Sequence, residues 1–207
     1  NLNLFSGEST ICKNQTDISS DPVRNVFKNQ HNQLRSAVAR GMVKMKDGIK
    51  CRNATQMWKL EYNCGLEASA HEAAKGCRKV DSTSKQFDEV WHVFDKAIPD
   101  MKDAAQRAIK LWYKEIETGY MNQTTGLMNM FLPELNIPHF ARMIWDSHRE
   151  IGCAVVKCTS ATKVVCHYSP AVVRFGNTIY AMGGRTCNLC ERMSAECSKV
   201  GLCLKRK

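Results

Sequence analysis

The sequence predicts an α+β domain in which helices cover an antiparallel sheet. Apolar residues recur at helical spacing through the earlier part of the 207-residue chain, and β-branched runs come later. This order lacks the strict alternation of helix and strand that a doubly wound sheet requires. The 11 cysteines are spread along the whole chain, a pattern that indicates disulfides rather than a single metal knuckle.

Four helices are expected, over residues 20–41, 64–77, 100–118 and 139–148. The first begins where Ser20 can cap the helix and Pro22 occupies its first turn. His31 faces inward on this helix, four residues after Phe27, and we interpret it as a buried structural histidine. The third helix has the clearest apolar face, formed by Ala105, Ala108, Ile109, Trp112 and Ile116.

Three β-branched runs predict strands over residues 154–157, 164–168 and 178–182. The segment from Cys187 onward holds four cysteines and almost no large apolar side chains, so disulfides must hold it. Its Cys187-Asn188-Leu189-Cys190 pattern is interpreted as part of these structural bridges rather than as a redox or zinc site. We therefore divide the chain into a main domain, residues 1–183, and a cysteine-rich extension, residues 184–207.

The cysteines and three N-glycosylation sequons predict a secreted, extracellular protein. The sequon asparagines are Asn14, Asn53 and Asn122, and each is expected in an exposed loop. No apolar run reaches the ~18–20 residues that a transmembrane helix needs. The chain starts at Asn1 without an apolar leader, which is interpreted as a mature form.

Five short motifs occur in order along the chain. They are His31-Asn32-Gln33-Leu34-Arg35, Trp112-Tyr113-Lys114-Glu115, His139-Phe140-Ala141-Arg142-Met143-Ile144-Trp145, Val165-Cys166-His167-Tyr168-Ser169-Pro170 and Gly176-Asn177. Together they resemble the motifs of the CAP superfamily, which includes cysteine-rich secretory proteins, insect venom antigen 5 and plant pathogenesis-related class 1 proteins. The chain most resembles the nematode activation-associated secreted, or venom-allergen-like, proteins. This resemblance implies a three-layer αβα sandwich over residues 1–183 and a short hinge-like extension over residues 184–207.

The resemblance also implies a cleft with two histidines and two acidic residues, which binds zinc in some members of the family. His139 and Glu115 match two of these positions. Asp81 stands where the family has its other histidine, and the second acid corresponds to Asp88 or to its neighbour Glu89. Zinc favours nitrogen and sulfur ligands, so one imidazole with carboxylates is a poor zinc site. We expect no bound metal and no cofactor, and we interpret His139 and Glu115 as a hydrogen-bonded pair that orders the cleft.

No GxSxG, HExxH or P-loop pattern is present, and we assign no catalytic residue. The leading hypothesis is a non-enzymatic secreted parasite protein that interacts with its host and modulates immunity. A lipid or sterol carrier that uses the cleft is the alternative, and a hydrolase that uses His139 and Glu115 is the third possibility.

The formal net charge of +10 suits anionic partners, but a solvated basic surface is the favoured explanation. No stretch interleaves basic and aromatic residues as single-strand nucleic-acid binding requires. We expect a host protein, lipid or receptor as the partner, and no nucleic acid.

The odd cysteine count leaves one thiol without a partner in its own chain. The resemblance accounts for ten cysteines and leaves Cys51, in a loop shortly before the Asn53 sequon. An exposed thiol at this place can bridge two chains. We therefore predict a homodimer, with Cys51 as the candidate for an intermolecular disulfide.

Overall fold

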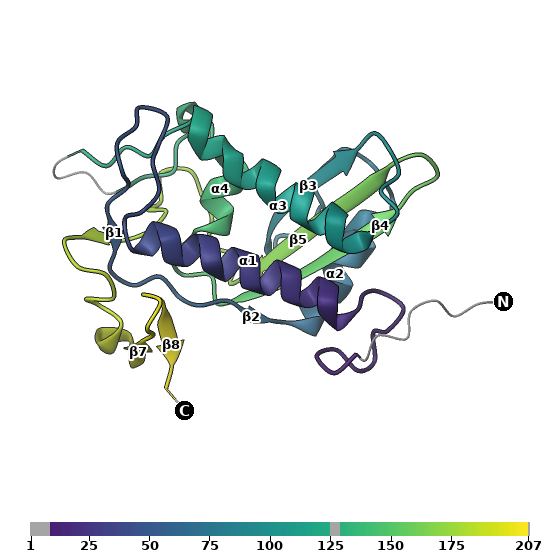
Figure 1. Cartoon of the computed structure of the whole chain (residues 1–207), viewed down its shortest axis with the longest axis horizontal. Coiled ribbons are helices and arrows are strands. Elements are labelled where there is room, and N and C mark those ends of the chain that lie inside the picture. Colours follow the sequence, from purple (N-terminus) through teal and green to yellow (C-terminus); the bar gives the residue numbers. More distant parts are fainter. Residues whose placement is uncertain (1–8, 125–128, 207) are drawn as a thin grey trace.

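The computed structural model describes residues 9–124 and 129–206, and its central layer is a four-stranded sheet in the order β2-β4-β5-β3 (Figure 1). The strands are β2 (Glu61–Tyr62), β3 (Asp88–Phe94), β4 (Glu150–Lys157) and β5 (Thr162–Ser169). Strand β5 pairs antiparallel with both β3 and β4, while β2 pairs parallel with β4. The mixed helix-and-sheet fold predicted from the sequence is confirmed.

Helices cover both faces of this sheet. They are α1 (Asp21–Ala39), α2 (Cys64–Lys75), α3 (Met101–Thr118) and α4 (Pro138–Met143), with short 3₁₀ turns at Pro133–Leu135 and Glu191–Met193. Helix α2 covers one face of β4 and β5, and Figure 1 shows α1 and α3 on the opposite side of the sheet. The first three helices lie close to their predicted ranges, whereas the fourth ends at Met143, before the predicted 148.

The period of two in a strand explains how one sheet supports two apolar layers. On β5, Val164 and Cys166 point into the large core shared with α1, α3 and α4. The intervening Val165 points to the other face and packs against Ala70 and Ala74 of α2. Small alanines at this interface let the helix approach the sheet closely.

Helix α2 begins close against the sheet at Gly152 on β4. A Cβ atom placed on Gly152 would lie 2.2 Å from the backbone nitrogen of Glu67 and 2.6 Å from the carbonyl oxygen of Asn63. Both contacts are with backbone, which cannot rotate away as a side chain can. Glycine is therefore required here by the start of α2.

One strand was not predicted, and one predicted strand was wrong. The structure has strand β3 at Asp88–Phe94, where none was expected, because polar residues interrupt its apolar pattern. In the predicted strand 178–182, only Met182 is in a strand: it belongs to the two-residue β6 (Met182–Gly183), which pairs antiparallel with β1 (Asn53–Ala54).

Five disulfides confirm the predicted framework. The pairs are Cys12–Cys64, Cys77–Cys158, Cys153–Cys166, Cys187–Cys197 and Cys190–Cys203. The two cysteines of the CxxC pattern pair with later cysteines rather than with each other. Both C-terminal bridges therefore cross-link the extension internally.

The prediction of an exposed Cys51 was wrong. Cys51 is the free cysteine, and only 3% of its surface is exposed. Its backbone N–H donates to the Val43 carbonyl, and its sulfur lies 3.6 Å from the Val38 carbonyl oxygen. A thiol held inside the core cannot reach a second chain without local unfolding, so the basis for a disulfide-linked dimer through Cys51 is removed.

The cysteine-rich extension lies against the segment that leads into β2. It contains β7 (Ala195–Cys197) and β8 (Cys203–Lys205). The backbone of Cys203 donates to Met57 at 2.8 Å and accepts from Lys59 at 3.0 Å. Between them, Trp58 packs among the extension's cysteines, and the Arg149 guanidinium lies 4.4 Å from its ring centroid. These contacts fix the extension on the domain.

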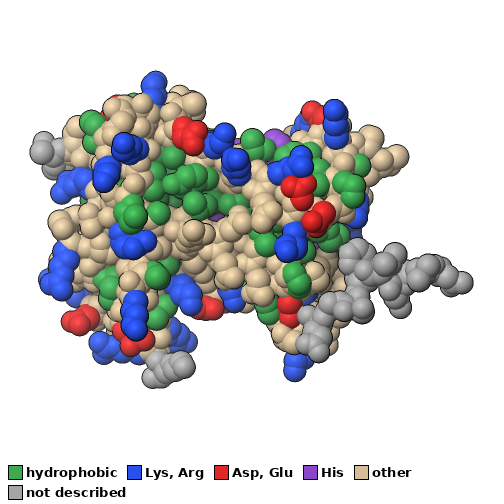
Figure 2. Space-filling model, viewed as in Figure 1, with side chains coloured by type: hydrophobic (Ala, Val, Ile, Leu, Met, Phe, Trp, Pro, Cys, Tyr) green, Lys and Arg blue, Asp and Glu red, His purple; other side chains and the backbone are tan. Residues whose placement is uncertain are grey.

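The charge is distributed over the surface. Figure 2 shows Lys and Arg side chains scattered around the visible face, with only a few acidic groups between them. The visible face therefore offers no single basic patch that would identify an anionic partner. Within the described ranges, none of the helices is both long and apolar enough to cross a bilayer.

Candidate functional site

A cavity of about 470 Å³ lies between the segment before β3 and the start of α4. Three of the four predicted cleft residues line it: Asp81, Asp88 and His139. The fourth, Glu115, projects from α3 and contacts His139. The structure thus gathers the predicted residues, and their hydrogen bonds decide what they can do.

Glu115 and His139 form a tight pair at the start of α4. Oε1 of Glu115 lies 2.5 Å from Nδ1 of His139. Oε2 accepts the backbone N–H groups of His139 and Phe140, each at 2.8 Å. The His139 ring also lies parallel to Trp112, at 6.3 Å between ring centroids. Glu115 therefore caps α4 and fixes the orientation of the imidazole.

Asp88 is only 7% exposed, and its carboxylate binds groups within the protein. Oδ2 accepts the backbone N–H groups of Val172 and Val173 and lies 2.9 Å from Nε2 of His148. Burial alone would raise the pKa of Asp88, but the hydrogen bonds from His148 and from the two backbone groups outweigh it and lower the pKa. Asp88 is thus an ionised anchor that holds the loop after β5.

The two remaining carboxylates of the cavity are also engaged. Asp81 is exposed and accepts the indole N–H of Trp91 at 2.7 Å. Glu89 accepts the backbone N–H of Ser82 and lies 2.8 Å from Nε2 of His167. Burial would raise the pKa of Glu89, but hydrogen bonding to His167 and Ser82 lowers it.

This donor set does not fit zinc. His139 is the one imidazole that lines the cavity. Zinc sites in proteins are built mainly from several nitrogen or sulfur ligands, which this cavity lacks. Across residues 9–124 and 129–206, no three His, Cys, Asp or Glu side chains are grouped to hold a metal.

Two functional partners in this region were missed from the sequence, His148 and His167. Both are fully buried, and burial is the main cause that lowers the pKa of each. The second ring nitrogen of His167 lies 2.7 Å from the Ser69 hydroxyl on α2, but Ser69 does not line the cavity. His148 is 60 residues from Asp88, and no spacing rule links them.

His31 is placed as predicted. It is completely buried, and its ring nitrogens lie 2.8 Å from the Phe27 carbonyl oxygen and from the Tyr168 hydroxyl. Burial lowers its pKa to about 3. It is a neutral structural histidine that joins α1 to β5.

The sequons occupy different environments. Asn14 is exposed, as predicted. Asn53 is half-buried in β1, and its amide donates to the Thr186 hydroxyl at 2.7 Å, so the expectation of an exposed loop was wrong there. Asn122 is half-buried and accepts the Thr124 hydroxyl.

The three-layer fold and the family motifs around this cleft define a protein class. Residues 28–168 match the model of the cysteine-rich secretory protein family, and the chain belongs to this CAP family. It is 34% identical over 200 residues to the Ancylostoma secreted protein of Ancylostoma caninum, covering 93% of this chain and 46% of that protein. It is 29% identical over 191 residues to hookworm platelet inhibitor 1 of the same organism, covering 91% of this chain and 83% of the inhibitor.

Solved structures agree with this assignment. The chain superposes on NaASP2 with Zn²⁺ with a TM-score of 0.79 at 30% identity, covering 90% of this chain and 97% of that one. It superposes on Na-ASP-1 with a TM-score of 0.80 at 32% identity, covering 99% of this chain and 50% of that one. The chain thus spans about half the length of some relatives that it matches. The names of its relatives describe secreted and venom proteins.

Proposed function

We propose that this chain is a secreted nematode protein that acts on its host by binding host proteins, without catalysis, and that its effect is immunomodulatory. The observation that carries the proposal is the state of the cleft. The carboxylates of Glu115 and Asp88 accept hydrogen bonds from backbone N–H groups, and Glu115 also fixes the His139 ring. These side chains therefore stabilise the fold, and this arrangement supports a structural rather than a catalytic role for them.

A hydrolase would need a nucleophile beside a base and an open reaction site. In the described cavity, the hydroxyl groups come from Ser82 and Ser84, and neither bonds to His139. This arrangement supports a protein that acts by binding.

Secretion is supported by the five disulfides, which form and persist in oxidising compartments. The platelet inhibitor among the relatives is named for an effect on host cells, and this supports a host-directed role. Partners among host proteins or receptors remain part of the proposal, as does a non-covalent homodimer.

A lipid or sterol carrier needs a mainly apolar cavity to cover an acyl chain or a ring system. The cleft beside His139 is instead lined by charged side chains, including Asp81, Lys85 and Arg174. The cleft chemistry therefore favours protein binding over the carrier alternative.

The test uses the glycosylated chain, fluorescently labelled and incubated with mammalian leukocytes and platelets. We expect saturable binding and a change in cytokine release or platelet aggregation. The His139→Ala variant, once shown to be folded, should bind and act as the wild type does. Absence of saturable binding to both cell types would overturn the proposal, as would an effect that disappears in His139→Ala together with a measurable hydrolysis.

A further inference from the structure

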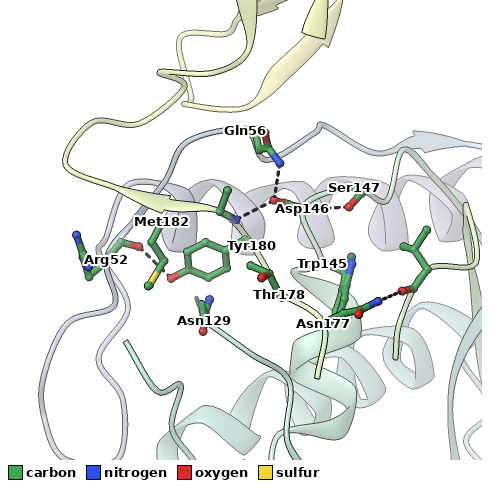
Figure 3. A pocket seen from close by; sticks show the side chains of 12 residues that line it. Arg52, Gln56, Asn129, Trp145, Asp146, Ser147, Asn177, Thr178, Tyr180 and Met182 are labelled. Carbon is green, nitrogen blue, oxygen red and sulfur yellow. Dashed lines mark hydrogen bonds between the residues drawn. The ribbon is translucent and has the colours of Figure 1, made fainter. Parts of the chain in front are cut away.

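A second cavity, of about 750 Å³, is lined in part by the residues that follow α4 (Figure 3). It shares no lining residue with the His139 cleft. Most of its wall comes from three segments: residues 52–56 around β1, residues 145–147 after α4, and residues 177–182; Asn129 and Val172 complete the lining. From its position and its chemistry, we propose that this cavity binds a saccharide.

The wall of the cavity is rigid because one carboxylate joins all three segments. Asp146 accepts the Gln56 side-chain amide at 3.2 Å and the Ala181 backbone N–H at 2.9 Å. Its second oxygen accepts the Ser147 hydroxyl at 2.8 Å (Figure 3). The carboxylate is 4% exposed, so these hydrogen bonds occupy it and a ligand meets mainly its neighbours.

Aromatic rings form the apolar part of the same wall. Trp145 and Tyr180 are almost fully buried, so their positions are fixed. The Tyr180 hydroxyl donates to the Arg52 carbonyl at 2.9 Å. A site in which few groups must be ordered on binding loses little conformational entropy.

The polar groups of the wall are mostly uncharged. Asn129, Asn177 and Thr178 supply two carboxamides and a hydroxyl (Figure 3). A carboxamide offers both donors and an acceptor, and so matches sugar hydroxyls, which also donate and accept. A strongly charged ligand would find one cation, Arg52, and the occupied carboxylate of Asp146 among the lining side chains.

Asn129 is the group that most needs a partner. Its side chain is completely buried, and its Oδ1 has no hydrogen-bond partner among the described residues. Its Nδ2 contacts only the sulfur of Met121, at 3.9 Å. A buried amide without partners costs about 1–3 kcal/mol. Its oxygen has almost no accessible surface, so a ligand hydroxyl would remove this cost only after the wall around Asn129 opened.

The rim adds a means of selecting among sugars. Arg52 and Asn177 are the exposed members of the lining, and Figure 3 shows them at opposite ends of the cavity. A carboxylate or sulfate on a neighbouring sugar unit would meet the Arg52 guanidinium there. The site thus requires hydroxyls within the cavity and tolerates an acidic group outside it.

The experiment is a screen of the whole chain against an array of neutral, sialylated and sulfated mammalian oligosaccharides, followed by calorimetry with the sugars that bind. We expect saturable binding that Asn177→Ala and Thr178→Val each weaken at least tenfold. Both positions are partly or fully exposed, so these variants should fold. Arg52→Gln should weaken acidic sugars more than neutral ones.

Two controls locate the site. Asn188→Ala removes an exposed carboxamide on the extension, and His139→Ala alters the other cleft. Neither variant should change sugar affinity. Failure of every oligosaccharide to bind at millimolar concentration would overturn the inference, and so would binding that Asn177→Ala and Thr178→Val leave unchanged. Neither result would affect the host-protein binding proposed above, which is measured on cells with the cavity variants as well as the wild type.

Discussion

Glu115 on α3 caps the first turn of α4 by accepting the backbone N–H of His139 at 2.8 Å. The family acid thus joins two helices that are separated in the sequence by residues 119–137. Glu115 and His139 of the family motifs thus have a structural role here that needs neither a metal nor a substrate.

Replacing Glu115 by Ala should lower the free energy of unfolding by about 1–3 kcal/mol, because two backbone N–H groups of α4 lose their acceptor. Urea unfolding followed by circular dichroism measures the loss. Glu117→Ala is the matched control on the same helix, since Glu117 is exposed and should matter little. Equal stability of both variants would show that the cap contributes nothing.

Stability should fall as the pH drops below about 6.5, because buried histidines resist protonation in the folded state. Burial lowers the pKa of His31 to about 3 and also lowers that of His148 and His167. A histidine with a lowered folded pKa binds its proton only on unfolding, so stability is lost as pH falls through the unfolded value. His31 alone should cost about 2 kcal/mol between pH 6.5 and 5.

Urea titrations at pH 7, 6 and 5 test this, and His31→Gln should reduce the slope by up to one proton. The lowered pKa of Asp88 acts in a lower window, since its stabilisation is lost only below its ordinary value of 3.8. A free energy of unfolding that is constant from pH 7 to 5 would contradict the assignment of neutral buried histidines.

Gly152→Ala should destabilise the protein by about 2–3 kcal/mol, because the new methyl group meets the backbone at the start of α2. Gly184→Ala is a suitable comparison, since no atom lies within 4 Å of the added carbon there. Thermal unfolding should separate the two variants clearly. Similar melting temperatures would mean that α2 can move away from β4 without cost.

The Cys51 thiol should not react with a thiol reagent in the native protein and should react as a single thiol after unfolding in guanidinium. Burial raises the pKa of Cys51, which further lowers its reactivity. Cys51→Ala should run like the wild type on a non-reducing gel and on a sizing column. A disulfide-linked dimer that this variant abolishes would show that the loop opens in solution.

Asn14 should carry a glycan when the chain is expressed in a secretory eukaryotic cell, because its side chain is exposed. Asn53 should stay unmodified, since its amide bonds to Thr186 inside the β1–β6 pair. Glycosidase shifts of Asn14→Gln and Asn53→Gln distinguish the two sites. Loss of the shift only in Asn53→Gln would reverse this assignment.

The helices were predictable because their apolar faces are complete. On α3, Ala105, Ile109, Trp112 and Ile116 are all buried at helical spacing, as the sequence indicates. Strand β3 was not predictable from the sequence, because Asp88, Glu89 and His92 interrupt its apolar pattern. Two of these polar residues are satisfied by histidines from β5 and from the loop before β4, and such long-range pairing leaves no local signal.

The same limit applies to the candidate site. Motif spacing placed His139, Asp81 and Asp88 at one cavity, because the family motifs encode the fold. Their hydrogen-bond partners could not be predicted from motif spacing. For Asp88, these partners include the backbone N–H of Val172, so its role is structural. The prediction of an exposed Cys51 failed for a related reason. Its polar neighbours Lys50 and Arg52 are exposed, while its own side chain is buried.

The contacts between Cys203 and the backbone on either side of Trp58 have a consequence for longer chains. A second module attached beyond residue 206 would begin only a few residues after β8. This strand is hydrogen-bonded to the domain through Cys203, pairs antiparallel with β7, and is tied by a disulfide to Cys190. The extension would then be a rigid connection between the modules rather than a flexible hinge. It would set the angle between the two modules, and with it which of their surfaces can engage one target at the same time.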